Sequence, residues 1–354
     1  MKTSKSNFIK TNPFSLRILF LIPLLAFSAC ASQPQECVCV CDCPSEETAG
    51  EQTAADTAES ENSEAVIPEE TAEETGGFVP CPIAFDSDRD GNLEIYTMDS
   101  NGENLVNLTN DPADDWNPDW SPDGSQIAFT SDRETEDGGG QFIYVMNADG
   151  SNVFQLTTLS PSDYADWSPD GGAIIFSSDA TGNHEIYIMK ADGSNEPTNF
   201  TNSDAQDIQP TWSPDGSQIA WLSGEEDHWD LFVMNADGSD VLQLTDNGGV
   251  YDMTWTIDGQ LFTHWDNGQY GCFNCVMNAD GSNVTDAGGK GEIQRYLPYW
   301  TLEGDRVELV SADMGEGNDE IYLVGEIYPD VLFNLTNNPG NDRNPDWAAL
   351  CGPN

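Results

Sequence analysis

The chain has 354 residues, enough for one large domain or two ordinary ones, and carries 63 Asp and Glu residues against 11 Lys and Arg, a formal charge of −52. Affinity for a phosphate backbone comes from clustered Lys and Arg, so this charge excludes a sequence-independent nucleic-acid-binding protein. A hydrophobic content of 38% still supports a folded core. The charge favours cations or basic proteins as partners. Adaptation of the surface to high salt is a further explanation of the acidity, compatible with any function.

Residues 1–29 have the features of an export signal. They contain no Asp or Glu, and four basic residues precede an apolar run over residues 18–27. The run is shorter than the roughly 20 residues of a membrane-spanning helix. Its end resembles a bacterial lipobox, with Phe27 where Leu is usual. This resemblance implies that Cys30 becomes a lipidated first residue; plain secretion and an uncleaved anchor are the alternatives.

Two segments without a core follow the signal. Residues 30–44 contain the predicted lipidation site, Cys30, and four more cysteines at every second position, Cys37, Cys39, Cys41 and Cys43. This spacing differs from the CxxC pairs of metal sites and favours disulfides, within the chain or to another molecule. Residues 45–78 are mostly Glu, Thr, Ala and Ser. They cannot bury enough apolar surface to fold, so we expect an extended acidic stalk or a plain solvated linker.

A repeated phrase begins after the stalk. Tryptophans recur in phrases such as PDWSPDG at intervals of 43 to 47 residues, at Trp120, Trp167, Trp212, Trp255, Trp300 and Trp347. This interval is the length of one four-stranded propeller blade. Residues 79–354 are therefore predicted to be all-β, a six-bladed β-propeller of four-stranded antiparallel blades.

Each repeat contains the strands and turns of a blade. Strand a ends at the Trp, SPDG forms the first turn, strand b follows over residues such as 127–129, and strand c carries the EIYVM phrase. An Asp-Gly turn with positive φ angles is expected at ADGS, before a short strand d. The array begins on a strand b at residues 82–85 and ends on a strand a at residues 344–347. Pairing of these N- and C-terminal strands is expected to close the ring without a free edge.

The repeat itself points to a family. IAFDSDRDGNLEIYTMDSNGENLVNLTNDPADDWNPDWSPDG resembles the repeat of the TolB-type, WD-like six-bladed propellers, over about residues 83–347. The resemblance implies the fold and leaves the function open. The family's namesake has an α/β domain before its propeller, whereas this chain has the signal, cysteines and stalk there. We therefore do not expect a strict equivalent of that protein.

Four further cysteines are predicted to form disulfides. Cys81 and Cys351 fall on either side of the missing a–b turn of the first blade, where a bond between them would replace that turn; two free thiols are the alternative. Cys272 and Cys275 form a CxxC sequence in blade 5. Export favours a disulfide there over a redox role, because a thioredoxin-like βαβ context is lacking.

The mouth of the central channel is the predicted binding site. Ligands of propellers usually bind there, and the loop before strand a supplies one residue five positions before each Trp: Asp115, Ser162, Asp207, Val250, Arg295 and Asp342. Their neighbours offer aromatic or cationic contacts: Trp116, Tyr164, Tyr251, Tyr296 and Arg343. The alternative is that Asp at this position only satisfies backbone donors at the start of strand a.

Two sets of residues are candidates for a metal. His184, His228 and His264 are expected on or near the b–c loops of neighbouring blades, where three imidazoles would suit a metal; solvated loop residues are the alternative. Asp86, Asp88 and Asp90 alternate before Gly91 as oxygen ligands of Ca²⁺ do. The bidentate Glu of a calcium loop is replaced by Thr97, so a simple turn is the alternative. We expect no cofactor, with Ca²⁺ as the alternative.

Motifs of common enzymes are absent from the sequence, which contains no GxSxG, HExxH or P-loop. We therefore expect a non-catalytic, monomeric lipoprotein, exported and anchored by its lipid to the bacterial cell envelope. Its propeller would bind a protein or a glycan through the face that carries the b–c and d–a loops. The alternative is a metal-assisted lyase or hydrolase that uses the three histidines on an extracellular polymer.

Overall fold

A computed structural model of the chain describes residues 82–133, 140–225, 228–265, 274–287, 296–300, 306–312, 317–325 and 328–348. All of them belong to the unit Ala72–Asn354. They form six antiparallel sheets of four strands each. The six-bladed all-β propeller predicted from the tryptophan spacing is thereby confirmed. In this described part of the chain, no helix has the length and apolarity to cross a membrane.

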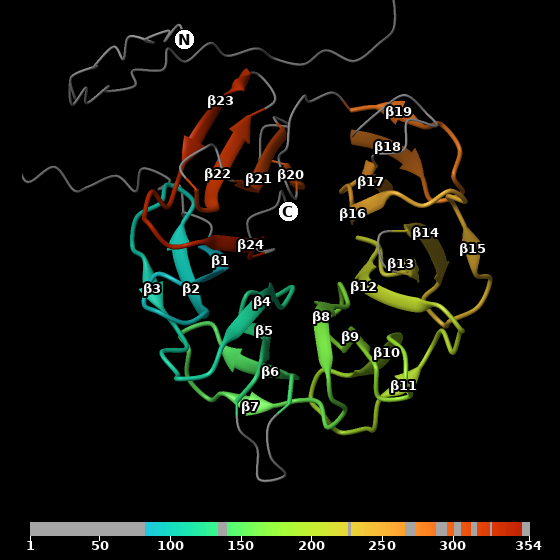
Figure 1. Cartoon of the computed structure of the whole chain (residues 1–354), viewed down its shortest axis with the longest axis horizontal. Helices are drawn as coiled ribbons and strands as arrows, with labels where there is room; N and C mark the ends of the chain where they lie inside the picture. Colours follow the sequence, from blue (N-terminus) through green and yellow to red (C-terminus); the bar gives the residue numbers. More distant parts are fainter. Residues whose placement is uncertain are drawn as a thin grey trace, which may run out of the picture. The chain divides into compact units, whose positions relative to one another are not determined.

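The blades follow one another along the chain, and their innermost strands surround the centre (Figure 1). From the innermost to the outermost strand, blade 1 contains β24 (Asp342–Trp347), β1 (Pro82–Ser87), β2 (Glu94–Asp99) and β3 (Val106–Asn107); blade 2, β4 (Asp115–Trp120), β5 (Gln126–Ser131), β6 (Phe142–Asn147) and β7 (Phe154–Gln155); blade 3, β8 (Ser162–Trp167), β9 (Ala173–Ser178), β10 (Glu185–Lys190) and β11 (Thr198–Asn199). Blade 4 contains β12 (Gln206–Trp212), β13 (Gln218–Glu225), β14 (His228–Asn235) and β15 (Leu242–Gln243); blade 5, β16 (Val250–Trp255), β17 (Gln260–Trp265), β18 (Asn274–Asn278) and β19 (Thr285–Asp286); blade 6, β20 (Tyr296–Trp300), β21 (Arg306–Ala312), β22 (Glu320–Gly325) and β23 (Tyr328–Asn334).

The ring is closed by strands from the two ends of the repeat array. β24 pairs antiparallel with β1, with Ile83 opposite Trp347 and Ser87 opposite Asp342. One residue beyond this ladder, the N–H of Ala348 donates to the carbonyl of Pro82 at 3.1 Å. The predicted closure is confirmed: the last strand of the array fills the innermost place of blade 1, which removes an unpaired edge.

The core lies between the blades. The second strand of a blade is buried on both faces, since residues after its first are almost all inaccessible, as in β1 and β5. Trp120 packs in one cluster with Ala84 and Ile95 of blade 1 and Phe129 of its own blade. The other repeat tryptophans whose side chains are described also pack against the preceding blade, which explains why the repeat needs a large residue there.

The tight turns lie on the face opposite the loops, hereafter the turn face. In the ADGS turn of blade 2, Gly150 N–H donates to Asn147 O at 2.8 Å, and Gly150 has a φ of +78° while Asp149 does not enter the left-handed region. The expected positive φ is therefore confined to the glycine. A Cβ at Gly150 would lie 2.7 Å from the carbonyl oxygen of Leu108 in blade 1, so this turn requires glycine for packing as well.

Candidate functional site

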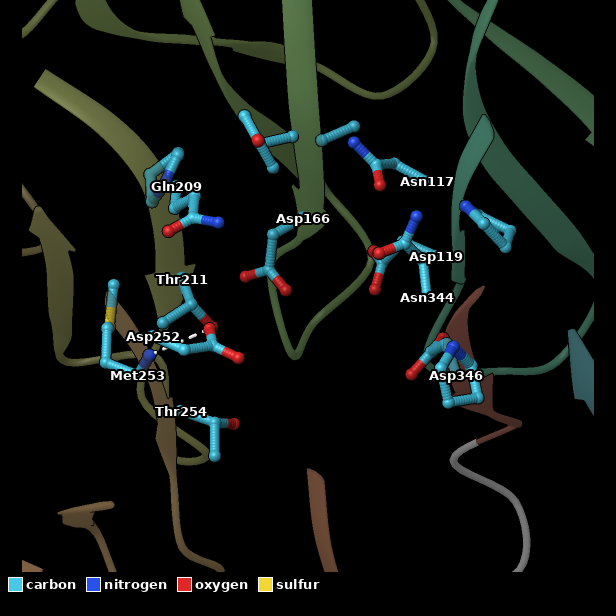
Figure 2. A pocket seen from close by; sticks show the side chains of 15 residues that line it. Asn117, Asp119, Asp166, Gln209, Thr211, Asp252, Met253, Thr254, Asn344 and Asp346 are labelled. Atoms are coloured by element: carbon cyan, nitrogen blue, oxygen red, sulfur yellow. Dashed lines mark hydrogen bonds between the residues drawn. The ribbon is translucent and has the colours of Figure 1, made fainter. Parts of the chain in front are cut away.

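A repeated tripeptide lines the central channel. The third, second and first residues before the repeat Trp surround a cavity of about 260 Å³ in every blade whose innermost side chains are described. Their side chains project into the hollow from separate strands (Figure 2). The tripeptides are 117–119 of β4, 164–166 of β8, 209–211 of β12, 252–254 of β16 and 344–346 of β24.

A β-bulge in the innermost strand directs this tripeptide to the channel. In β4 the pairing with β5 shifts between Trp116 and Asp119. The bulged residue has a left-handed backbone in four blades, with φ of +51° at Asn117, +56° at Tyr164, +52° at Gln209 and +49° at Asn344. Such a backbone costs about 1–2 kcal/mol for a residue with a side chain. Bulges and strain of this kind often redirect side chains at functional sites.

Three carboxylates, Asp119, Asp166 and Asp346, stand directly before the repeat Trp and connect neighbouring blades; we call them the clasp carboxylates. Each accepts a hydrogen bond from the backbone N–H of the repeat Trp in the next blade: Asp346 from Trp120 at 2.7 Å, Asp119 from Trp167 at 2.9 Å, and Asp166 from Trp212 at 2.7 Å. The bonds tie the innermost strands of blades 1 to 4 together in chain order. Blades 4 and 5 carry Thr211 and Thr254 at this position.

The clasp carboxylates retain protons at unusually high pH. Burial raises the pKa of Asp166 and of Asp346 to about 7, although hydrogen bonds from the following blade oppose the shift. Burial also raises the pKa of Asp119 well above its ordinary value, and the charges of Asp166 and Asp346 raise it further. Because the charge of one carboxylate raises the pKa of another, the three groups do not ionise independently.

This arrangement predicts that the protein loses stability as the pH rises from about 4 to about 7. In that range the folded protein keeps protons on the clasp carboxylates, whereas the unfolded chain, with Asp pKa values of about 3.9, has released them. The free energy of unfolding therefore decreases with increasing pH. In Asp346→Asn we expect a weaker decrease, because Asn does not titrate. Urea denaturation of the full-length protein at several pH values between about 4.5 and 7.5 measures both slopes.

Asp123→Asn is the matched control for this experiment. Asp123 is exposed on the turn face, and hydrogen bonds, above all from the Ser125 hydroxyl, lower its pKa. Its ionisation contributes stability that is lost only as the pH falls through its depressed pKa, so the slope between about pH 4.5 and 7.5 should equal that of the wild type. Equal slopes in the wild type and in Asp346→Asn would contradict the role given to the clasp carboxylates.

A second cavity, of about 380 Å³, lies where the channel meets the loop face. It combines aromatic rings, carboxylates, amides and one arginine, and we call its lining the mouth site: Asp86, Leu93, Trp116, Asn117, Asp163, Tyr164, Ser311, Asp319, Arg343 and Asn344. Asn117, Tyr164 and Asn344 line both cavities. A group that enters the mouth site therefore lies next to the inner cavity with its clasp carboxylates.

Neutral donors fix Asp163 in the mouth site. Its Oδ1 accepts hydrogen bonds from Asn117 Nδ2 and Thr130 Oγ1, both at 2.8 Å, and its Oδ2 accepts one from Trp116 Nε1 at 3.3 Å. These donors orient the carboxylate and carry no positive charge to cancel its own. The Trp116 ring is held beside it by the same bond. A carboxylate and an aromatic ring are thus held together at the channel entrance.

The other carboxylates of the mouth site come from blades 1 and 6. Asp86 accepts hydrogen bonds from Asn344 Nδ2 at 2.5 Å and from the Asn117 N–H at 3.1 Å. Asp319 accepts one from Arg343 Nε at 2.5 Å, and the Arg343 side chain is about half exposed. The mouth site therefore already contains one guanidinium bound to a carboxylate.

Three predicted mouth carboxylates do not face the mouth. Asp115, Asp207 and Asp342 are at most 1% exposed. Asp115 pairs with Arg133 and Asp342 with Arg89, each at 2.7 Å, while Asp207 accepts from Trp221 Nε1 at 3.1 Å. The prediction that these carboxylates ring the opening was wrong about their placement. Their partners are side chains of the same blades, whereas the alternative interpretation named backbone donors at the start of strand a.

The bulge explains the error. In a regular strand, residues at odd distances from the Trp share a face, so the fifth residue before the Trp would face the channel together with the first and third. The extra residue of the bulge reverses this alternation. The fourth residue before the Trp then reaches the mouth site instead: Trp116, Asp163 and Arg343. Two of these, Trp116 and Arg343, had been predicted as neighbours of the site.

Tyr164, a third predicted neighbour, lines both cavities, whereas Tyr251 is not a lining residue of either. Tyr251 is 50% exposed in β16, and its ring lies 6.2 Å from that of His264. Tyr296 begins β20, but its side chain lies outside the described residues, as does all of Arg295. Asp163, Asp319 and the clasp carboxylates were not singled out from the sequence. The sequence signal that could have identified the clasp carboxylates is the Asp directly before the Trp in the phrases PDW and ADW.

The candidate metal ligands are not brought together. His184 precedes β10, His228 begins β14, and His264 of β17 shares a hydrogen bond with Asn274 at 3.0 Å. Asp86 faces the mouth site, Asp88 accepts from Asn341, and Asp90 accepts from the Tyr96 hydroxyl. Across the described ranges, no three His, Cys, Asp or Glu side chains are grouped in a way that would hold a metal ion.

Cysteine positions are described at one site. Cys275 in β18 is buried and disulfide-bonded. Its proposed partner Cys272 lies outside the described residues, as do Cys81, Cys351, Cys30 and Cys37, Cys39, Cys41 and Cys43. The pairings stay predictions.

Comparisons with known proteins agree with this architecture. The TolB beta propeller domain matches residues 78–165 and 160–290, more than half of the chain. TolB from Acinetobacter baumannii is 19% identical, with a TM-score of 0.63 over 77% of this chain and 68% of that one. Hydrazine synthase from Kuenenia stuttgartiensis (20% identity, TM-score 0.57, 77% of this chain and 47% of that one) and a chain of a nidogen/laminin complex (12%, 0.56, 76% and 98%) share the fold. On the extent of the domain match, this chain belongs to the TolB β-propeller domain family.

Proposed function

We propose that the chain is a non-catalytic binding protein of the bacterial cell envelope that holds a partner protein or glycan at the loop face of its propeller. The observation that carries the proposal is the mouth site, where Trp116 and Tyr164 lie beside the fixed carboxylate Asp163 above a second cavity. Aromatic rings with a few oriented polar groups in a concave site are typical of ligand recognition. The rigid ring of blades keeps these groups in place.

The N-terminal sequence supports placement at the envelope. The export signal, the lipidation of Cys30 and the acidic residues 45–78 together would hold the propeller away from a membrane surface. Such a display leaves the loop face accessible to large partners. These segments lie outside the described residues, and the proposal for them rests on the sequence alone.

Site-specific photo-crosslinking in the full-length, envelope-located protein tests this function. A photoreactive phenylalanine analogue replaces Tyr251, which is 50% exposed at the loop-face end of β16, or Ile257, which is 53% exposed in the turn after the same strand. We expect a discrete cross-linked product at position 251 and none at 257. Trp116→Ala should reduce the product by about tenfold, as the loss of a central aromatic contact does.

The two positions match in blade and exposure, and they differ in face because they lie near opposite ends of β16. A product at 257 alone, or equal products at both positions, would contradict binding at the loop face. A product at 251 that is insensitive to Trp116→Ala would place the partner outside the mouth site.

A further inference from the structure

We infer that the mouth site recognises a cationic side chain, the guanidinium of arginine or the ammonium of lysine, presented by a protein partner. This inference rests on the proposed function and makes it more specific, because it selects a basic protein segment over a neutral glycan. It concerns the entrance of the channel and requires no metal ion.

The propeller itself shows which groups hold a guanidinium. Arg133 lies between the Asp115 carboxylate, at 2.7 Å, and the ring of Phe129, whose centroid is 5.3 Å from the guanidinium carbon. Arg89 lies in the same way between Asp342, at 2.7 Å, and Tyr96, at 4.7 Å. A carboxylate beside an aromatic face is a general solution for binding this cation, through charge-assisted hydrogen bonds and cation–π attraction.

The mouth site contains the same combination in a cavity open to a partner. Asp163 is oriented by neutral donors, and the indole of Trp116 is bonded to it, with Tyr164 next to it on the same strand. The cavity of about 380 Å³ has room for a guanidinium and several methylene groups. Aromatic rings alone would also suit a sugar, but the carboxylates favour a cation.

The surroundings strengthen the preference for positive charge. Arg343, already in the mouth site, donates through Nε to Asp319 at 2.5 Å, so a carboxylate of this site already pairs with a guanidinium. The formal charge of −52 adds a long-range attraction for basic partners.

Two matched peptides test the inference on the full-length protein. The first is a capped pentapeptide, acetyl-Gly-Arg-Gly-Arg-Gly-amide, and the second replaces both arginines by citrulline, which has nearly the same shape and no charge. Isothermal titration calorimetry at low salt should show binding of the arginine peptide and at least about tenfold weaker binding of the citrulline peptide. Asp163→Asn should also lower the affinity for the arginine peptide by about tenfold.

Two control variants separate recognition from general attraction. Asp149→Asn removes the same charge from an exposed turn on the turn face, and we expect unchanged affinity. Arg343→Gln removes the cation that competes for Asp319, and we expect tighter binding of the arginine peptide. A variant that merely unfolds cannot produce this increase.

Each contrary outcome has a defined meaning. Equal affinities for the two peptides, or equal losses in Asp163→Asn and Asp149→Asn, would overturn the inference. Binding of an N-acetylglucosamine oligomer in place of the arginine peptide would also overturn it and assign the site to a glycan. If the arginine peptide does not bind while the cross-link at position 251 persists, the proposed function stands and only the cationic partner is rejected.

Discussion

Arg133→Ala is expected to lower the free energy of unfolding by about 3–5 kcal/mol, the cost of leaving a buried charge without its partner. The Asp115 side chain is fully buried, and the Arg133 side chain, 16% exposed, meets it at 2.7 Å. The guanidinium also covers the rings of Phe129 and Tyr144, at 5.3 and 5.4 Å from their centroids. Burial already raises the pKa of Asp115, and the charge of Arg133 opposes this. The variant loses the compensating charge and the stacking together.

Blade 3 supplies a natural control for this prediction. The positions that correspond to Asp115 and Arg133 are Ser162 and Ala180 there, and the Ser162 hydroxyl donates to the carbonyl of Leu159 at 2.7 Å. Blade 3 thus replaces both members of the ion pair and leaves no buried charge. We expect Asp115→Ser combined with Arg133→Ala to be more stable than Arg133→Ala alone, even though it carries one more substitution.

Chemical denaturation of the wild type, both single variants and the double variant completes the cycle. A coupling energy of at least about 1 kcal/mol between the two positions is expected, because residues in one buried ion pair do not act independently. Additive losses would show that Arg133 acts through packing on the aromatic rings and not through Asp115. Circular dichroism before denaturation confirms that each variant is folded.

The fold was predictable because its signals are local and repeated. The tryptophan interval counts the blades, and SPDG and ADGS mark turns whose glycines have positive φ, as at Gly150. The closure of β24 on β1 followed from the strand type at each end of the array. Each turn and strand signal depends on residue identity within a few positions, and its repetition along the chain defines the blades and the ends of the array, so one sequence is sufficient to recognise them.

The binding surface was less predictable because a single inserted residue reverses which side chains face the channel. Nothing in DWNPDW fixes where a bulge falls, and the φ of +51° at Asn117 is established by the structure and not by the residue pattern. Counting back from Trp120 therefore selected Asp115, which is buried, and gave only a secondary role to Trp116, which lines the mouth site. Asp163 was missed for the same reason. Its importance depends on Trp116 and Asn117 of the neighbouring blade, contacts between residues more than 40 positions apart.

The junction between β1 and β24 favours the proposed disulfide between Cys81 and Cys351. Hydrogen bonding continues past the paired residues to Pro82 and Ala348, at 3.1 Å. Cys81 precedes Pro82 directly, and Cys351 follows Ala348 by only a few residues. A bond between the two cysteines would lock the closure of the ring. It would also close a loop that contains nearly the whole propeller, for which the entropy of the unfolded chain predicts a stabilisation of about 5 kcal/mol.

The two predicted disulfides close loops of very different length, so a loss of stability that depends on loop length can be separated from a general effect of removing cysteines. The paired variant Cys81→Ser with Cys351→Ser should lose about 5 kcal/mol of unfolding free energy, whereas Cys272→Ser with Cys275→Ser, which opens a loop of a few residues if these two are paired, should lose only about 2 kcal/mol. Denaturation of the oxidised full-length protein measures both losses, and mass spectrometry of non-reduced peptides identifies the bonds. No turn connects β24 to β1. In the variant without Cys81 and Cys351 the unfolding rate should therefore increase more than the folding rate decreases, and unfolding should begin at blade 1. Equal losses in the two variants, or a non-reduced peptide map without a Cys81–Cys351 bond, would show that strand pairing alone holds the ring closed.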